Sequence, residues 1–170
     1  MLHNHISHYS LEPIHLQPVM QLTVQVAAPV EAGQVIHALG QGKRRIIPIV
    51  GGTVLLNTRG LQLQGEVLAG GADFQLVTSS TAAQLDARYI LRLSDNSHIY
   101  VSNSAIRTGS EQDIAALVRG ENVPHERIYF RCAPRFEVER NDLAWMTQTL
   151  FVGTGARFPD RVEMVFYEVK

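Results

Sequence analysis

The stretch "LQLQGEVLAGGADFQLV", residues 61–77, predicts a β-hairpin. In its first half Leu61 and Leu63 alternate with glutamines, which is the period-two pattern of a strand with one buried face. The paired glycines at 70–71 supply a turn, because glycine adopts positive φ without steric cost. A strand pattern follows these glycines, and no Gly-Lys-Ser/Thr follows them, which argues against a phosphate-binding loop.

Alternation of the same kind continues on both sides of this hairpin, from about residue 19 to residue 169, and predicts about nine or ten short strands. Gly51 and Gly52 are expected to turn the chain between two of them, and residues 144–153 are expected to form a strand. One short helix interrupts the strands at residues 110–120, with a serine N-cap and a terminal glycine. The fold class is therefore all-β.

Length and composition indicate one domain, at residues 18–170, preceded by an N-terminal arm at residues 1–17. The formal net charge of −1 predicts no nucleic-acid partner, and no apolar run reaches the roughly 20 residues that a membrane helix needs. With a single cysteine, Cys132, no internal disulfide is possible, and we expect a cytoplasmic protein. The arm carries His3, His5 and His8, which are expected to form a polar tail; metal binding is the alternative.

Short strands with frequent turns form either a sandwich or a closed barrel, and the alternation pattern leaves both open. In a sandwich the polar faces would meet solvent, whereas in a barrel some polar side chains can point into a cavity. Asp73 and Gln75 share a face of one strand, and Asp86 and Arg88 share a face of the next. Polar groups clustered inside a small barrel are costly without partners or water, which suggests a pocket.

Six blocks, in order along almost the whole chain, resemble the domain-of-unknown-function family 3237, also known as uncharacterised protein family 0311. The blocks are "RRIIPIVGG" (44–52), "GEVLAGGADFQLV" (65–77), "AQLDARYIL" (83–91), "IYVSNSAIR" (99–107), "YFRCAPRFE" (129–137) and "WMTQTLFVGTG" (145–155).

The resemblance implies a closed antiparallel β-barrel, lipocalin- or calycin-like, with an internal cavity and self-association. It directs attention to the polar residues of the blocks, but implies no settled chemistry. These residues are Glu66, Asp73, Gln75, Asp86, Arg88, Tyr100, Asn103, Arg107, Arg131 and Trp145. The chain departs from the family pattern at Ala105, where glycine is expected, and at Met146 and Thr147, where leucine and asparagine are expected.

Two carboxylates, Asp73 and Glu66, flank the glycine turn and are the candidate catalytic residues. If their strands pair, the two groups would lie near one sheet end, share a proton and split their pKa values, as general acid/base chemistry requires. The alternative is that each caps a turn or pairs with an arginine. The candidate ligand-binding residues are Gln75, Asp86, Arg88, Tyr100, Arg131 and Trp145.

These groups suggest distinct roles. Arg88 would suit a carboxylate, Tyr100 could donate a proton, and Trp145 could stack on a flat ligand or belong to the core. Cys132 lacks the His/Asp arrangement of a nucleophile and is expected to be a buried, inert thiol.

The sequence therefore favours a β-barrel that binds a small organic ligand, with a cofactor-free isomerase, lyase or cyclase as the enzymatic version. The alternative is a structural or interaction protein whose inner polar groups satisfy one another. No cofactor, metal, nucleic-acid or membrane partner is predicted. A homo-oligomer is predicted, through an exposed terminal strand at residues 161–169, whose Met164 and Phe166 would need cover.

Overall fold

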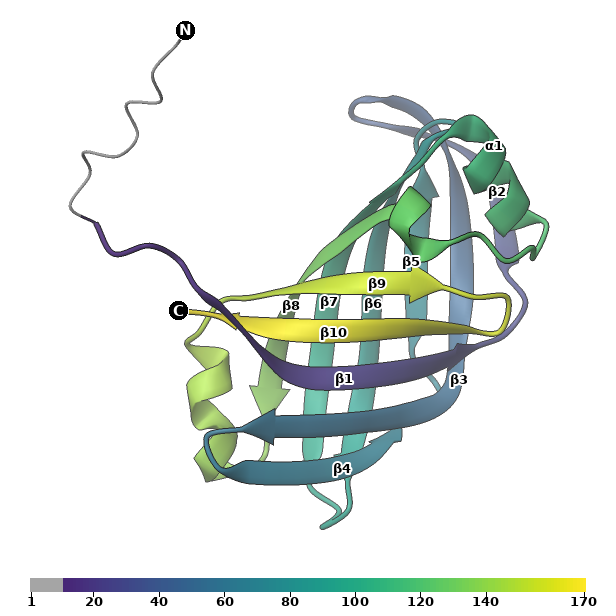
Figure 1. Cartoon of the computed structure of the whole chain (residues 1–170). Coiled ribbons are helices and arrows are strands. Elements are labelled where there is room, and N and C mark those ends of the chain that lie inside the picture. Colours follow the sequence, from purple (N-terminus) through teal and green to yellow (C-terminus); the bar gives the residue numbers. More distant parts are fainter. Residues whose placement is uncertain (1–10) are drawn as a thin grey trace, which may run out of the picture.

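The computed structural model describes residues 11–170 (Figure 1). His3, His5 and His8, and most of the predicted arm, lie outside the described residues. The first strand begins at Leu16, just before the predicted domain boundary. Among residues 11–170, no helix has the length and apolar content that crossing a membrane requires.

Ten antiparallel strands form one sheet. They are β1 (Leu16–Val26), β2 (Val30–His37), β3 (Gly40–Thr58), β4 (Leu61–Val67), β5 (Ala72–Val77), β6 (Ala82–Leu93), β7 (His98–Thr108), β8 (Tyr129–Val138), β9 (Phe151–Arg157) and β10 (Arg161–Val169). Helix α1 spans Glu111–Val118, and two 3₁₀ segments, η2 and η3, span His125–Arg127 and Asn141–Thr147.

The sheet closes on itself because β1 pairs on both sides. Leu22 lies opposite Met164 of β10 on one side and opposite Val54 of β3 on the other. Strands β4 and β5 share one position in the barrel, between β3 and β6. β5 joins these two strands at one end of β3, and β4 joins them at the other end. The barrel is therefore the correct choice between the two all-β architectures. The β2–β3 hairpin projects from the end that α1 covers (Figure 1).

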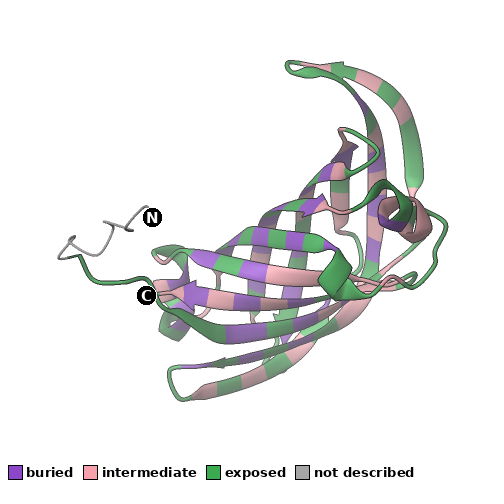
Figure 2. Cartoon of the chain, turned by 45° about the horizontal axis from the view of Figure 1, so that its top comes forward, coloured by how far each residue is buried: buried purple, intermediate pink, exposed green. Residues whose placement is uncertain are grey.

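Buried and exposed residues alternate along the strands, as the bands in Figure 2 show. The end of the barrel away from α1 is filled mainly by apolar side chains, with Thr58 and Glu168 buried among them, and is closed by η3, whose Leu143 and Met146 are fully buried. Within this core the rings of Phe136 and Phe151 meet edge to face, with centroids 5.0 Å apart. A solid core at this end leaves room for a cavity only toward α1.

The predicted turn at Gly51 and Gly52 is wrong, because β3 runs through both glycines. Gly52 has φ +137°, and a Cβ there would overlap the backbone carbonyl of Thr23 on β1. The β1–β3 register also shifts next to this point. The two glycines therefore allow a bent strand and a close approach of two backbones, not a reversal of the chain.

The strand expected at residues 144–153 is wrong in its first part, because residues 141–147 form η3, while residues 151–153 begin β9. Strand β8 continues through Pro134. Pro134 is tolerated because β9 pairs with β8 only at Arg131 and Cys132, so no ladder bond is required there.

The terminal strand β10 is not an exposed edge. It pairs with both β1 and β9, and Met164 and Phe166 are buried inside the barrel. The argument for self-association through this strand is therefore wrong.

Candidate functional site

The barrel holds a cluster of polar side chains in the half that α1 covers. Asp73 and Gln75 come from β5, Asn103 and Arg107 from β7, and Arg157 from β9. They line a cavity of about 40 Å³. The remaining wall is largely apolar and is formed by Val24, Val26, Ile47, Ile49, Leu85, Ala87, Phe130, Val162 and Met164, with Tyr89 and Ala105.

A second hollow, of about 170 Å³, lies next to this cavity on the side of α1, and we call it the mouth. The two share the lining residues Ile47, Gln75, Arg107 and Arg157, so they adjoin at these side chains. The segment from Leu117 to Gly120, at the end of α1, covers the mouth. Arg45 of β3 also lines it.

Several buried polar atoms in the cluster have no hydrogen-bond partner among residues 11–170. They are Gln75 Oε1, the Tyr89 hydroxyl, Asn103 Oδ1 and Arg107 Nε. Buried polar groups in folded proteins are nearly always satisfied, by protein or by water. Four such atoms around one cavity mark a place where water or a ligand supplies the missing partners.

Asp73 is held in place by two hydrogen bonds. Its Oδ2 accepts from Gln75 Nε2 at 2.7 Å and its Oδ1 from the backbone N–H of Asp86 at 3.1 Å. Burial raises the pKa of Asp73 above its ordinary value, against the opposing effects of the Gln75 hydrogen bond and of the Arg107 charge. The cavity therefore contains a carboxyl group that holds its proton more tightly than an ordinary aspartate.

Burial also acts on the basic groups of the cluster. It lowers the pKa of Arg107 to about 10, and it lowers the pKa of Arg157. Arg107 still carries its charge at neutral pH. Burial raises the pKa of the Cys132 thiol to about 12, in agreement with the expected inert cysteine.

Of the predicted site residues, the structure brings only Asp73 and Gln75 to the cavity. Asp86 and Arg88 form a pair on the outer face, 3.5 Å between Oδ2 and Nη2, because their neighbours Leu85, Ala87 and Tyr89 take the inner face of β6. The pair Asp73 and Gln75 and the pair Asp86 and Arg88 therefore lie on opposite faces of the sheet.

Glu66 also points outward, where its Oε1 accepts from Arg92 Nε at 2.9 Å. Asp73 and Glu66 thus lie on opposite faces of the sheet and cannot share a proton. The alternative weighed for Glu66, pairing with an arginine, describes what the structure shows.

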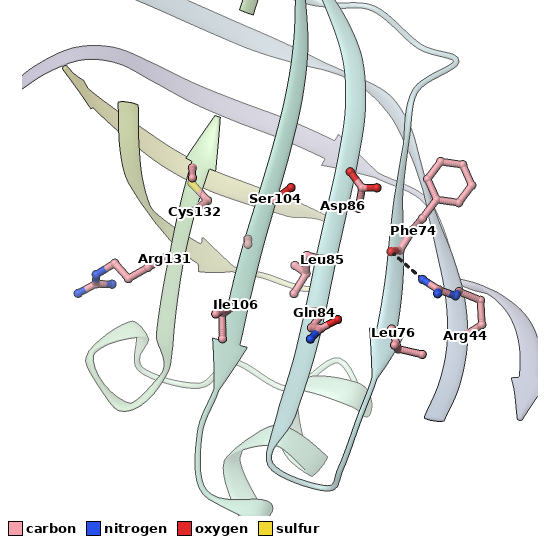
Figure 3. Close-up of a pocket in the computed structure, with 12 residues that line it drawn as sticks. Arg44, Phe74, Leu76, Gln84, Leu85, Asp86, Ser104, Ile106, Arg131 and Cys132 are labelled. Atoms are coloured by element: carbon pink, nitrogen blue, oxygen red, sulfur yellow. Dashed lines mark hydrogen bonds between the residues drawn. The ribbon is translucent and has the colours of Figure 1, made fainter. Parts of the chain in front are cut away.

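The last three predicted residues lie elsewhere. Tyr100 and Arg131 are on the outer faces of β7 and β8. Figure 3 shows that the Arg131 side chain extends from β8 away from Asp86 and from the other labelled side chains. Trp145 belongs to η3 at the opposite end of the barrel, where the Arg59 guanidinium carbon lies 3.8 Å from its ring centroid.

The groove in Figure 3 is larger than the inner cavity, about 590 Å³, but it is open to solvent. Its charged side chains, Arg44, Asp86 and Arg131, remain hydrated or paired, so nothing there requires a ligand. The inner cavity is the better candidate site because several of its polar atoms are buried from water and have no hydrogen-bond partner among the described residues.

Sequence reasoning did not select Arg107 and Asn103 beyond the family blocks, and it missed Tyr89, Arg45 and Arg157. The signal for β7 was present, since the apolar residues Ile99 and Val101 set the inner phase that Asn103 and Arg107 continue. Arg157 is reached only through barrel closure, which no local pattern encodes.

Comparison with known proteins agrees with the fold and the blocks. The profile of the family described as "Protein of unknown function (DUF3237)" matches residues 14–169. A UPF0311 protein of Rhodopseudomonas palustris is 39% identical over 151 residues, which cover 89% of this chain and 94% of that protein. Its crystal structure superposes with a TM-score of 0.81 at 35% identity, covering 94% of this chain and 99% of the other.

Two other solved structures share the architecture. A "beta-barrel like protein" of Acinetobacter baumannii has a TM-score of 0.77 at 36% identity, covering 95% of this chain and 99% of that one. An enzyme from Penicillium herquei has a TM-score of 0.64 at 14% identity, covering 95% and 98%, and at that identity shows the fold alone. The profile match and the relatives together show that the chain belongs to the DUF3237 (UPF0311) family.

Proposed function

We propose that this protein binds a small organic ligand inside the barrel, in the cavity under α1. The observation that carries the proposal is the set of buried, unpartnered polar atoms on Gln75, Tyr89, Asn103 and Arg107 around one enclosed space. Each such atom costs roughly 1–3 kcal/mol when left without a partner, so a protein that keeps several together gains from a molecule that completes them.

The shape of the space limits the ligand. The inner cavity and its mouth, about 40 and 170 Å³, are smaller than the roughly 300–1,000 Å³ of pockets that enclose drug-sized molecules. Phe130, Val162 and Met164 offer an apolar wall opposite the polar groups. A small molecule with one polar end and one apolar end fits this division.

A second candidate function is cofactor-free catalysis, as in an isomerase, lyase or cyclase, with Asp73 as the general acid/base. The raised pKa of Asp73 favours it, because burial shifts this carboxyl group in the direction that general acid/base catalysis requires. The charge of Arg107 would then stabilise negative charge that develops on the ligand.

A thermal-shift screen with small carboxylic acids, phenols and sugars tests binding in the cavity. We expect at least one class to raise the Tm by about 5 °C at a concentration 100-fold above its Kd. The cavity-filling variant Ala87→Leu should abolish the shift, because Ala87 lines the inner cavity. Ala133→Leu, the same change on the outer face of β8, should keep it.

Two results would contradict the proposal. A shift that survives in Ala87→Leu but not in Ala133→Leu would move the ligand to the outer groove. The absence of a shift with every class would favour the alternative, a structural protein whose inner polar groups are satisfied by one another and by water.

A further inference from the structure

The mouth of the cavity carries an excess of positive charge. Four arginines line it: Arg45 from β3, Arg107 from β7, Arg157 from β9, and Arg119 at the end of α1. Among the described residues that line the mouth or the inner cavity, Asp73 is the only acid. Even with Asp73 ionised, the site has more cationic than anionic groups.

Three of the four arginines have partners. Arg119 Nε donates to Glu121 Oε1 at 2.6 Å, outside the cavity. Arg45 Nε donates to Glu31 Oε1 at 2.9 Å. Arg157 Nη1 donates to the backbone carbonyls of Phe158 and of Arg161, the latter at 3.2 Å. The contacts of Arg45 and Arg157 hold both side chains at the rim of the mouth.

Arg107 differs from the other three. Its side chain is 6% exposed, and among residues 11–170 its Nε has no hydrogen-bond partner and its guanidinium has no ion pair. A buried charge without a partner is expensive, and proteins normally pair such a group or place it where a ligand pairs it. The guanidinium of Arg107 therefore lacks an anionic partner within the described part of the protein.

Asp73 does not fill that role. Both of its oxygens already accept hydrogen bonds, from Gln75 and from the backbone of Asp86, and none comes from Arg107. Burial moreover raises the pKa of Asp73, against the opposing effect of the Arg107 charge, so this carboxyl group is a weaker counter-ion than an ordinary aspartate.

We infer that the cavity takes a small carboxylic acid, whose carboxylate binds the guanidinium of Arg107 at the junction of mouth and inner cavity. This inference rests on the proposed function, ligand binding in the cavity, and names the ligand's chemical class. The free Nε–H and a neighbouring Nη–H form the planar fork that matches a carboxylate. Gln75 and Arg157 line the same junction, and the apolar part of the acid lies against Phe130 and Met164.

The test uses matched pairs of probes that differ only in charge. Acetate, butyrate, benzoate and cyclohexanecarboxylate, each with its primary amide, are titrated into the full chain by calorimetry at pH 7 and constant ionic strength. We expect at least one acid to bind about tenfold or more tightly than its amide, the factor that a hydrogen-bonded charge contributes. Arg107→Gln should remove this preference and leave the affinity for the amide within about twofold.

The control variant is Arg131→Gln. Arg131 lies on the outer face of β8, so its loss should leave the preference for the acid unchanged. Stability gives a second readout: replacing an unpartnered buried charge by an apolar side chain of similar length, Arg107→Met, should leave the Tm of the ligand-free protein unchanged or higher.

The outcomes separate this inference from the proposed function. Equal binding of acids and amides, unaffected by Arg107→Gln, overturns the inference but not ligand binding in the cavity. Binding of phenols or sugars without binding of any acid has the same meaning. No binding by any probe overturns both. A large fall in the Tm of Arg107→Met overturns the inference as well, since it would show that Arg107 is already paired within the fold.

Discussion

Asp73 and Asp86 are the same residue type on adjacent strands, yet one faces the cavity and the other faces solvent. For Asp73, burial raises the folded-state pKa above the unfolded value of about 3.9. Between these two pKa values the folded state binds more protons, so stability falls as pH rises. Asp73→Asn removes this loss. The free energy of unfolding of the variant relative to wild type should therefore increase between pH 4 and pH 7, by about 1.4 kcal/mol per unit of pKa difference, in urea titrations at each pH.

The matched control is Asp86→Asn, which removes a carboxylate of the same type from the outer face. A pH dependence as large in this variant as in Asp73→Asn would contradict the assignment of a raised pKa to Asp73.

The sequence predicted in part which of the two aspartates, Asp73 or Asp86, lies inside the barrel. The apolar phase of β6, Leu85 and Tyr89, already places Asp86 outside, but Arg157 of β9 lies near Asp73 only because the barrel closes.

At the scale of elements, helix α1 positions the segment from Leu117 to Gly120 that covers the mouth. The first turn of α1 is held in place by its N-cap. Ser110 Oγ accepts from the backbone N–H of Asp113 at 3.1 Å and donates to Asp113 Oδ2 at 2.7 Å. Ser110→Ala should cost about 1 kcal/mol, which corresponds to a fall in Tm of about 2–4 °C, and should speed hydrogen exchange of the α1 amides. Gln112→Ala, an exposed change in the same turn, should alter neither. Faster exchange throughout the barrel in Ser110→Ala would show that α1 is not a separable cover.

This helix was predictable because its signals are local: an N-cap serine, early acids and a closing Gly120 at φ +80°. The segment η3 was not predictable in this way. Its sequence alternates like a strand, but Leu143 and Met146 are buried only because the end of a closed barrel lies beneath them. Elements whose burial depends on distant strands need the whole fold to define them.

At the scale of the whole molecule, the barrel was expected from the family blocks, since alternation by itself fits a sandwich equally well. Closure depends on β1, which joins β10 to β3. The same β1–β3 contact bears on the site, because Val24, which lines the inner cavity, lies opposite Gly52. A change that separates these two strands should therefore damage both the stability of the barrel and its cavity.

Gly52→Ala makes that change. Its new Cβ would overlap the Thr23 carbonyl, so the strands must move apart. Gly70→Ala is the matched control: Gly70 also has positive φ, +109°, but a Cβ there meets nothing within 4 Å. The control should cost about 1–2 kcal/mol for backbone strain alone, and Gly52→Ala at least about 2 kcal/mol more, measured by urea unfolding. Equal losses would mean that β1 and β3 are not in close contact at Gly52, and closure of the barrel would then need a different explanation.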